Sequence, residues 1–389
     1  MTLGKEGITR MIVFLSFYPD ELTERDGMMQ RVAAIDSMFS GHRRLYLRVS
    51  LKGYRRHTVT VRGPVSIERV NLFIHHRYID YRLREASCVY VHSVLNALSP
   101  LPYLWKFNHK TVLDLHGVVP EELVFMGRRK LATFYSFAEW VMVKNCRLVV
   151  VVTQKMRQHF LTKYGGYLDA SRILTLPNMV PRQVLPPEPR CERAESPILR
   201  LIYAGGVHKW QNIDLMMGTL RQLATVREDW QARIYVPENA IFEVQEKVDQ
   251  ACGGSRIAVG SLPHSEVMKE YATADAGFIL RDATLLNKVA MPTKLVEYMN
   301  YGVVPIVLSP DIGDFPMLGY RYLTLNDLFD KDKLSPDRLE EMRAINSRIM
   351  AALCDSASEA RHALVSLLDG SDLRLSPGSG VDVAGVRVL

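Results

Sequence analysis

The feature that most constrains the fold is residues 291–307, MPTKLVEYMNYGVVPIV. Pro292 suits the first turn of a helix but not its interior, which predicts a short helix over residues 294–300. Gly302 predicts where that helix ends, because glycine adopts the left-handed conformation at little cost. The β-branched run 303–308 then predicts a buried strand. At such a helix start, backbone N–H groups and Lys294 suit a phosphate, and Glu297 in the helix suits a sugar hydroxyl.

Apolar strands alternate with helical stretches along most of the chain, which predicts mostly parallel sheets covered on both faces. The expected strands cover residues 11–17, 45–49, 67–73, 88–92, 111–115, 148–152, 173–176, 199–203, 232–236, 257–259, 276–280 and 303–308. Helices are expected at residues 31–39 and 129–144, and at residues 340–368 with a break near Asp355.

The length of 389 residues predicts more than one domain. Residues 181–197 contain five prolines and little apolar material, as a linker does. We therefore expect an α/β protein with two doubly wound domains, residues 1–185 and 198–370, joined by a linker at 186–197. The C-terminal strand ends of both sheets would meet at a cleft between them. Residues 371–389 lack periodicity and are predicted to be a mobile tail.

Composition places the chain among globular proteins, with 48% hydrophobic and 23% charged residues. No apolar run reaches the roughly 20 residues that cross a bilayer. Residues 11–17 are followed by Tyr-Pro-Asp-Glu rather than a cleavage site, so they predict a strand and not a signal peptide. Five scattered cysteines without a CxxC pair indicate a reducing cytoplasm and argue against a disulfide framework or a zinc site.

Positive charge is concentrated in the first half of the chain. Residues 1–185 contain 27 Lys and Arg against 14 Asp and Glu, whereas the remainder contains 22 against 28. The segment 42–57 has no acidic residue, and interleaved Leu and Tyr make it amphiphilic. It is either a solvated basic surface or a peripheral contact with an anionic membrane. No motif indicates nucleic acid.

A second constraint comes from residues 199–217, LRLIYAGGVHKWQNIDLMM. Gly205 and Gly206 follow a strand and allow the backbone to curl around an anion, and Lys209 can reach its charge. The pattern is neither GxGxxG nor a Walker A loop. Alone it could equally be an ordinary strand-to-helix turn.

The two stretches together resemble the nucleotide-sugar half of the family-four retaining glycosyltransferases, which have the GT-B fold of two Rossmann-like domains. The resemblance implies that Gly205, Gly206 and Lys209 hold the donor diphosphate and that Glu297 binds the ribose. Pro292, Thr293 and Lys294 would line the phosphate loop. Residues 259–262 would lie near the nucleobase.

One position departs from that family's pattern. Many members carry a second glutamate eight residues before the ribose ligand, where this chain has Val289. Some members instead have an upstream Arg and Asn, as Arg281 and Asn287 stand here. Arg281 is therefore a candidate for the diphosphate.

The first half contains further matching segments. In TVLDLHGVVPEE, Asp114 and His116 lie at a strand end, where the resemblance implies that His116 faces the donor sugar. A structural histidine is the alternative. The remaining candidates for the cleft or the acceptor are Gly27, Glu121, Gln154, Lys155 and Asn178.

The reaction implied is transfer of a sugar from a nucleoside diphosphate to an acceptor hydroxyl with retention. Lys209, helix N-termini and Arg281 or Lys294 would stabilise the leaving group, and His116 would orient the sugar. No metal or cofactor is implied, and Asp330-Lys331-Asp332 is interpreted as a solvated turn. The basic first half suggests an anionic or lipid-linked acceptor at the inner face of the cytoplasmic membrane, as in polysaccharide or glycolipid assembly. A nucleotide-sugar 2-epimerase and a non-catalytic sugar-nucleotide-binding partner are the alternatives.

Overall fold

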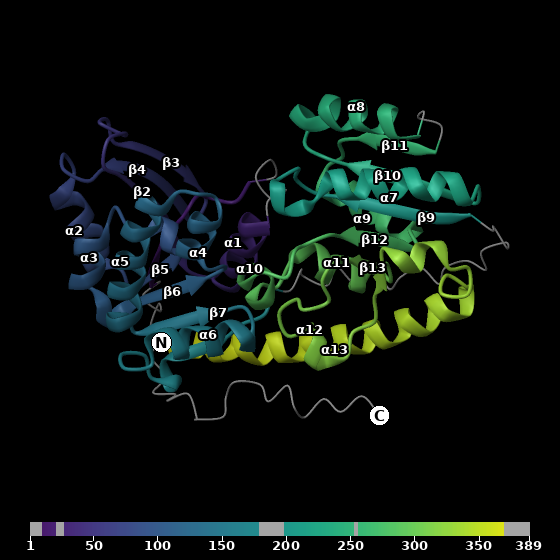
Figure 1. Cartoon of the computed structure of the whole chain (residues 1–389). Helices are drawn as coiled ribbons and strands as arrows, with labels where there is room; N and C mark the ends of the chain where they lie inside the picture. The colour runs from purple at the N-terminus through teal and green to yellow at the C-terminus, as the bar shows by residue number, and fades with distance from the viewer. Residues whose placement is uncertain (1–9, 21–26, 179–197, 253–255, 369–389) are drawn as a thin grey trace, which may run out of the picture. The chain divides into compact units, whose positions relative to one another are not determined.

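The computed structural model describes residues 10–20, 27–178, 198–252 and 256–368, which form two compact units (Figure 1). The first unit contains the chain up to Pro177 and the end of the last helix from Ser356 onward. The second unit runs from Asn178 to Asp355. The predicted linker at 186–197 and the predicted tail at 371–389 lie outside the described residues.

The first unit is built on one twisted sheet with helices between its strands. Its strands are β1 (Met11–Leu15), β2 (Arg43–Ser50), β3 (Thr58–Arg62), β4 (Val65–Asn71), β5 (Cys88–His92), β6 (Thr111–Leu115), β7 (Leu148–Val151) and β8 (Ile173–Thr175). Its helices are α1 (Gly27–Met38), α2 (His76–Glu85), α3 (Leu101–Lys106), α4 (Val119–Phe125), α5 (Arg129–Asn145) and α6 (Gln154–Tyr164).

These strands lie in the order β3-β4-β2-β1-β5-β6-β7-β8, and every pair is parallel except the edge pair β3–β4. The edge strand β3 is fully exposed, so it lacks the apolar run by which the other strands were predicted. The middle of strand β2 is buried: Leu45, Tyr46 and Leu47 are in the core. The segment 42–57 is therefore less amphiphilic at the surface than its sequence suggested.

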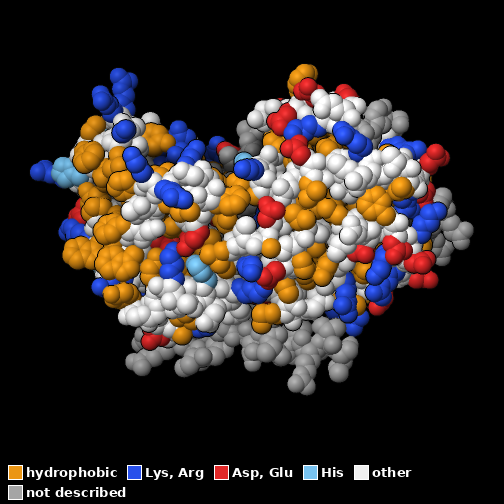
Figure 2. Space-filling view, viewed as in Figure 1, with side chains coloured by type: hydrophobic (Ala, Val, Ile, Leu, Met, Phe, Trp, Pro, Cys, Tyr) orange, Lys and Arg blue, Asp and Glu red, His pale blue; other side chains and the backbone are white. Residues whose placement is uncertain are grey.

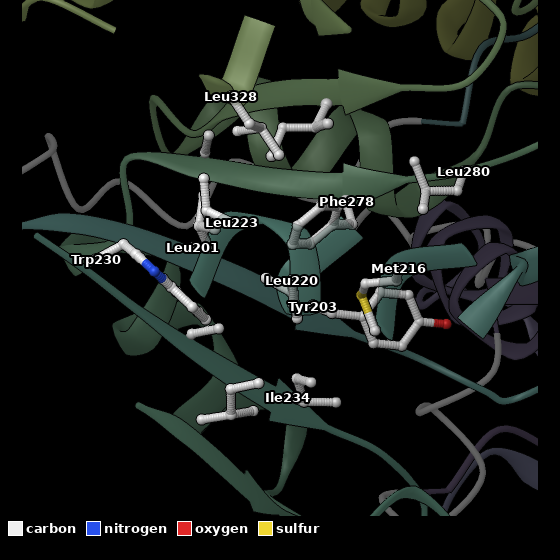
Figure 3. Packing of buried hydrophobic residues seen from close by; sticks show 14 of the residues in the cluster. Leu201, Tyr203, Met216, Leu220, Leu223, Trp230, Ile234, Phe278, Leu280 and Leu328 are labelled. Carbon is white, nitrogen blue, oxygen red and sulfur yellow. The ribbon is translucent and has the colours of Figure 1, made fainter. Parts of the chain in front are cut away.

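The second unit is a parallel sheet in the order β11-β10-β9-β12-β13-β14. Its strands are β9 (Leu199–Ala204), β10 (Trp230–Tyr235), β11 (Ile257–Gly260), β12 (Ala276–Ile279), β13 (Val304–Val307) and β14 (Leu323–Thr324). Its helices are α7 (Ile213–Val226), α8 (Ile241–Cys252), α9 (His264–Thr273), α10 (Leu285–Val289), α11 (Thr293–Asn300) and α12 (Phe315–Leu318). Figure 3 shows side chains of β9, β10, β12 and α7 packed into its core, among them Tyr203, Met216 and Phe278.

The last helix differs from its prediction. Helix α13 (Pro336–Leu368) is continuous, without the break expected near Asp355. The division between the two units instead falls at Asp355, and Ala360, Leu364 and Leu368 pack into the core of the first unit. The predicted second domain, 198–370, therefore extends too far, because the last turns of α13 bury their apolar face elsewhere. None of the helices in the described residues has the length and hydropathy needed to cross a membrane.

Candidate functional site

The second unit has a topological switch point between β9 and β12. Strands β10 and β11 lie on one side of β9 in the sheet. The later strands β12, β13 and β14 lie on the other side of β9. The pairing of β9 with β12 involves only Leu201–Ala276 and Ile202–Gly277, so the two strands are not paired at their C-terminal ends. Ligands of open parallel sheets bind at this position, outside the carboxyl ends of the strands.

The turn after β9 brings its glycine against a lysine from a distant part of the chain. Gly205 has φ +150°, and a Cβ at this position would lie 2.8 Å from Nζ of Lys294. The hydroxyl of Tyr203 donates a hydrogen bond to the carbonyl oxygen of Gly206 at 2.5 Å, which closes the turn. The positive φ favours glycine at 205, and a side chain there would push the end of Lys294 away from the turn.

Lys294 lies in an environment that disfavours its charge. Its Nζ is 3.8 Å from the centre of the Tyr203 ring and donates a hydrogen bond to Oε1 of Gln211 at 3.3 Å. Burial and the nearby guanidinium of Arg281 lower the pKa of Lys294 well below its ordinary value, against the opposing effect of Glu297. Two cationic groups held close together at a strand end form a site suited to an anion, because an anion relieves their repulsion.

Glu297 is buried rather than solvated, with an exposed fraction of 4%. Its Oε2 accepts a hydrogen bond from the hydroxyl of Tyr271 at 3.2 Å, and its Oε1 lies 3.5 Å from Nε2 of His264. His264 begins α9 directly after the loop that follows β11, so residues 261–263 lie close in the chain to a residue that contacts Glu297. Glu297 is therefore held inside the unit by side chains of α9 and is not a carboxylate in solvent.

The loop before α11 is fixed from two sides. Pro292 is the N-cap residue, at ψ 123°, and Thr293 opens the helix. Nδ2 of Asn178 donates a hydrogen bond to the carbonyl oxygen of Met291 at 3.2 Å. Behind the helix, a Cβ on Gly277 would lie 2.4 Å from the Tyr298 ring, so this glycine lets α11 pack closely on β12. The loop before α11 thus lies on a rigid base.

Lys209 lies apart from this cluster. It begins a short 3₁₀ turn, Lys209–Gln211, and its side chain is exposed and forms no hydrogen bond or ion pair with the described residues. The structure therefore brings together Gly205, Lys294, Arg281 and Glu297, and it leaves Lys209 on the rim of the same turn.

In the first unit, Asp114 and His116 belong to a buried ionic cluster at the ends of β5 and β6. Arg31 donates to the Asp114 carboxylate from Nε at 3.0 Å and from Nη2 at 2.8 Å. Nε2 of His116 lies 3.2 Å from Oδ2 of Asp114 and 3.3 Å from Nδ1 of His92. Asp114 is fully buried, whereas the His116 side chain is 11% exposed, so a ligand would meet His116 rather than Asp114.

The charge states in this cluster follow from its burial. Although burial would raise it, Arg31 and His116 hold the pKa of Asp114 well below its ordinary value. Burial lowers the pKa of His92 to about 4. One oxygen of Asp114 and one nitrogen of each histidine are close enough to share a metal ion. The guanidinium of Arg31 already neutralises the carboxylate, so the electrostatics favour the ion pair over a bound cation.

Four further candidates in the first unit lie on helices α1, α4 and α6. Gly27 is the first residue of α1, and Gln154 is the first residue of α6, with Lys155 next to it. Glu121 on α4 pairs with Lys163 at 2.7 Å. Gly27, Gln154 and Lys155 thus stand at helix starts, and Glu121 is in an ion pair.

Sequence reasoning missed four residues that make these clusters: His264, Tyr271, Arg31 and His92. Tyr271 and His264 hold Glu297 from another helix, and Arg31 and His92 surround Asp114. For His92, the sequence did contain an indication. His92 ends the strand next to the one carrying Asp114, and neighbouring parallel strands bring their C-terminal ends together.

The two parallel-sheet units and the switch-point site define a GT-B fold. No family model matches the chain, and no curated protein matches it. Solved structures do match, and sucrose-phosphate synthase from Thermosynechococcus elongatus is one, with TM-score 0.64, 13% identity, 93% of this chain and 100% of that chain covered.

Two further solved structures match the chain over a similar length. The Anabaena protein HepE, in complex with UDP and glucose, has TM-score 0.61 and 12% identity over 92% of this chain and 99% of that one. A trehalose-phosphate synthase (UDP-forming) from Burkholderia vietnamiensis has TM-score 0.60 and 12% identity over 94% and 99%. At these identities the similarity shows the fold, and the chain has the GT-B fold of these glycosyltransferases.

Proposed function

We propose that this protein is a retaining glycosyltransferase that moves a sugar from a nucleoside-diphosphate sugar to an acceptor hydroxyl. The observation that carries the proposal is the cationic pair Lys294 and Arg281 at the Gly205 turn, with the carboxylate of Glu297 on the same helix as Lys294. A nucleoside diphosphate offers both required groups, because its phosphates match the cations and its ribose hydroxyls match a carboxylate. The similar structure of HepE contains UDP and glucose, which supports this class of ligand.

Each candidate then has a role at the donor. Gly205 and Gly206 give the diphosphate access to the backbone, and Lys294, Arg281 and the rim residue Lys209 bind its charge. Pro292 and Thr293 begin the phosphate-binding helix, α11. Glu297 accepts hydrogen bonds from the ribose, oriented by Tyr271 and His264. His116, in the first unit, is our candidate for orienting the sugar.

The reaction requires one bond to break and one to form at the anomeric carbon. The bond to the diphosphate oxygen breaks, the acceptor oxygen bonds to the same face, and the acceptor proton passes to the departing phosphate. The charge that develops on the diphosphate is stabilised by Lys294, Arg281 and Lys209. Neither a protein nucleophile nor a metal is needed in this scheme. We place the activity in the cytoplasm, with a lipid-linked or glycan acceptor of polysaccharide or glycolipid synthesis.

A thermal-shift screen with UDP, GDP, ADP and their hexose derivatives tests the donor. A matched donor at one hundred times its Kd should stabilise the protein by about 2.7 kcal/mol. Radiolabelled donor with and without candidate acceptors then separates the functions. Acceptor-dependent release of nucleoside diphosphate supports a transferase, an epimerised donor without acceptor indicates the epimerase, and binding without turnover indicates a non-catalytic partner.

A further inference from the structure

The turn between α4 and α5 exposes an unbroken apolar and basic segment. Residues 124–131, Val-Phe-Met-Gly-Arg-Arg-Lys-Leu, are all exposed, and we call them the α4–α5 tip. Phe125 and Met126 have exposed fractions of 45% and 46%. The turn is nevertheless ordered by its backbone: Gly127 has φ +75°, and the N–H of Arg128 donates to the carbonyl of Leu123 at 2.8 Å. The exposed side chains therefore lie on a formed turn.

A partly buried ionic cluster holds the two helices behind the tip. Lys163 on α6 donates to Oε1 of Glu121 on α4 at 2.7 Å and to Oε1 of Glu139 on α5 at 2.5 Å. The hydroxyl of Tyr164 donates to the same Glu139 oxygen at 2.7 Å. Although burial opposes it, His159 and Lys163 lower the pKa of Glu121 to about 2. Three helices are thus tied together, and the tip extends beyond them.

The surface next to the tip continues its chemistry along α5. Lys130, Phe134 and Phe137 have the spacing of one helix face, and the two phenylalanines have exposed fractions of 63% and 57%. The acidic residue of α5, Glu139, is buried, so the exposed charges of this helix are all basic. Figure 2 shows hydrophobic side chains gathered on the surface over α3 and α5.

The three cations of the tip are not neutralised by an ion pair within the described part of the chain. Arg128, Arg129 and Lys130 are exposed, and their side chains form no ion pair with the described residues. Exposed Phe and Met directly beside unpaired cations are unfavourable in water alone. At an anionic bilayer the apolar side chains can enter the interface while the cations meet lipid headgroups.

We propose that the α4–α5 tip, with Phe134 and Phe137, docks this protein on a membrane surface that contains anionic lipid. The segment 42–57 offers less apolar surface for this role, because Leu45, Tyr46 and Leu47 are buried and Leu51 is its one exposed leucine. The inference does not depend on the proposed transferase activity, since membrane binding is measured without substrate.

Flotation of the full chain with vesicles tests it. Vesicles of phosphatidylcholine with phosphatidylglycerol are compared with vesicles of phosphatidylcholine alone, and we expect binding to the anionic vesicles only. The triple variant Arg128→Gln, Arg129→Gln, Lys130→Gln should lower the partition coefficient on the order of a hundredfold. The double variant Phe125→Ser, Met126→Ser should lower it at constant charge, on the order of tenfold.

The matched control removes the same charge elsewhere in the first unit. Lys52→Gln, Arg55→Gln, Arg56→Gln changes three exposed cations of the segment 42–57 and should retain most of the binding. All variants should keep the thermal unfolding temperature, because their side chains are exposed. Binding that is lost in the control and kept in the tip variants overturns the proposal. So does self-association by light scattering that disappears with Phe125→Ser, Met126→Ser, since the tip would then join two copies of the chain.

Discussion

Replacing Lys294 by methionine should change stability and nucleotide affinity in opposite directions. Methionine keeps the long unbranched shape that fits between Tyr203 and Gln211 but carries no charge. In the free protein the ammonium group is poorly solvated and faces Arg281, and for these reasons its pKa is lowered well below the ordinary value. The charged Lys294 side chain therefore lowers the free energy of unfolding of the ligand-free protein, and a bound anion removes this cost.

The sign of the stability change follows from linkage. The native state releases the Lys294 proton at a lower pH than the unfolded chain does, so the cost is complete below the native pKa and disappears as pH rises toward 10.5. At neutral pH, Lys294→Met should stabilise the free protein by about 1 kcal/mol. For a unit of this size that corresponds to an increase in unfolding temperature of about 2–4 °C. The difference from the native protein should shrink at alkaline pH.

The affinity should fall because one charge-assisted hydrogen bond to phosphate is lost. Such a bond contributes about 1.5–3 kcal/mol, or roughly a tenfold to hundredfold change in Kd. A bound anion favours the charged form of the Lys294 amine. Above the pKa that Lys294 has in the ligand-free protein, anion binding should therefore take up a proton, and the affinity should fall as pH rises.

Differential scanning fluorimetry and titration calorimetry measure both effects. Inorganic pyrophosphate and the best nucleoside diphosphate from the screen serve as ligands. Lys269→Met is the matched control, because Lys269 is an exposed lysine of the same unit, paired with Glu266 at the surface. It should change neither quantity. A lower unfolding temperature for Lys294→Met, or an unchanged affinity for both ligands, would refute the reasoning.

Three further perturbations test other parts of the account. Gly205→Ala places a methyl group against Nζ of Lys294 and should weaken pyrophosphate binding in calorimetry, whereas Gly218→Ala, in open space on α7, should not. Glu297→Gln should weaken nucleoside diphosphate binding about tenfold and leave pyrophosphate binding nearly unchanged, and equal losses for both ligands would exclude a ribose contact. Asp114→Asn leaves Arg31 buried without its charge partner and should lower the free energy of urea unfolding by about 3–5 kcal/mol, against less than about 1 kcal/mol for Asp80→Asn in a more exposed pair. Because the pKa of Asp114 is held low in the native state, this contribution should be complete above pH 3.8 and be lost as pH falls toward its native pKa.

The fold was predictable wherever apolar periodicity was strong. Buried parallel strands such as β5, β6 and β7 appear in the sequence as continuous apolar runs, and all three were predicted within one residue of their bounds. The exposed edge strand β3 was not predicted. Backbone pairing with β4 holds it in the sheet, and it has no buried apolar run that would reveal it in the sequence. The end of α13 was assigned to the wrong unit, since a helical period does not tell which core the helix packs against.

Local sequence patterns predicted the glycine turn after β9 and the helix and strand within residues 291–307, but not the residues that contact them. The collision of a Cβ at 205 with Lys294 joins residues 89 positions apart, a contact that local sequence patterns do not contain. Lys209 and Lys294 were both candidates for the diphosphate. The side chain of Lys209 is exposed, whereas Nζ of Lys294 lies against the ring of Tyr203. The pairing of Asp114 with Arg31, across a sequence separation of 83, is likewise a contact that local patterns do not contain.

The most direct test of the central claim is the anomeric configuration of the product. The donor identified in the thermal-shift screen is incubated with an acceptor that it glycosylates, and the new linkage is read by proton NMR before any equilibration. We predict a glycoside with the donor's own anomeric configuration and one nucleoside diphosphate released for each linkage formed. An inverted linkage, or an epimerised donor formed without acceptor, would contradict the account.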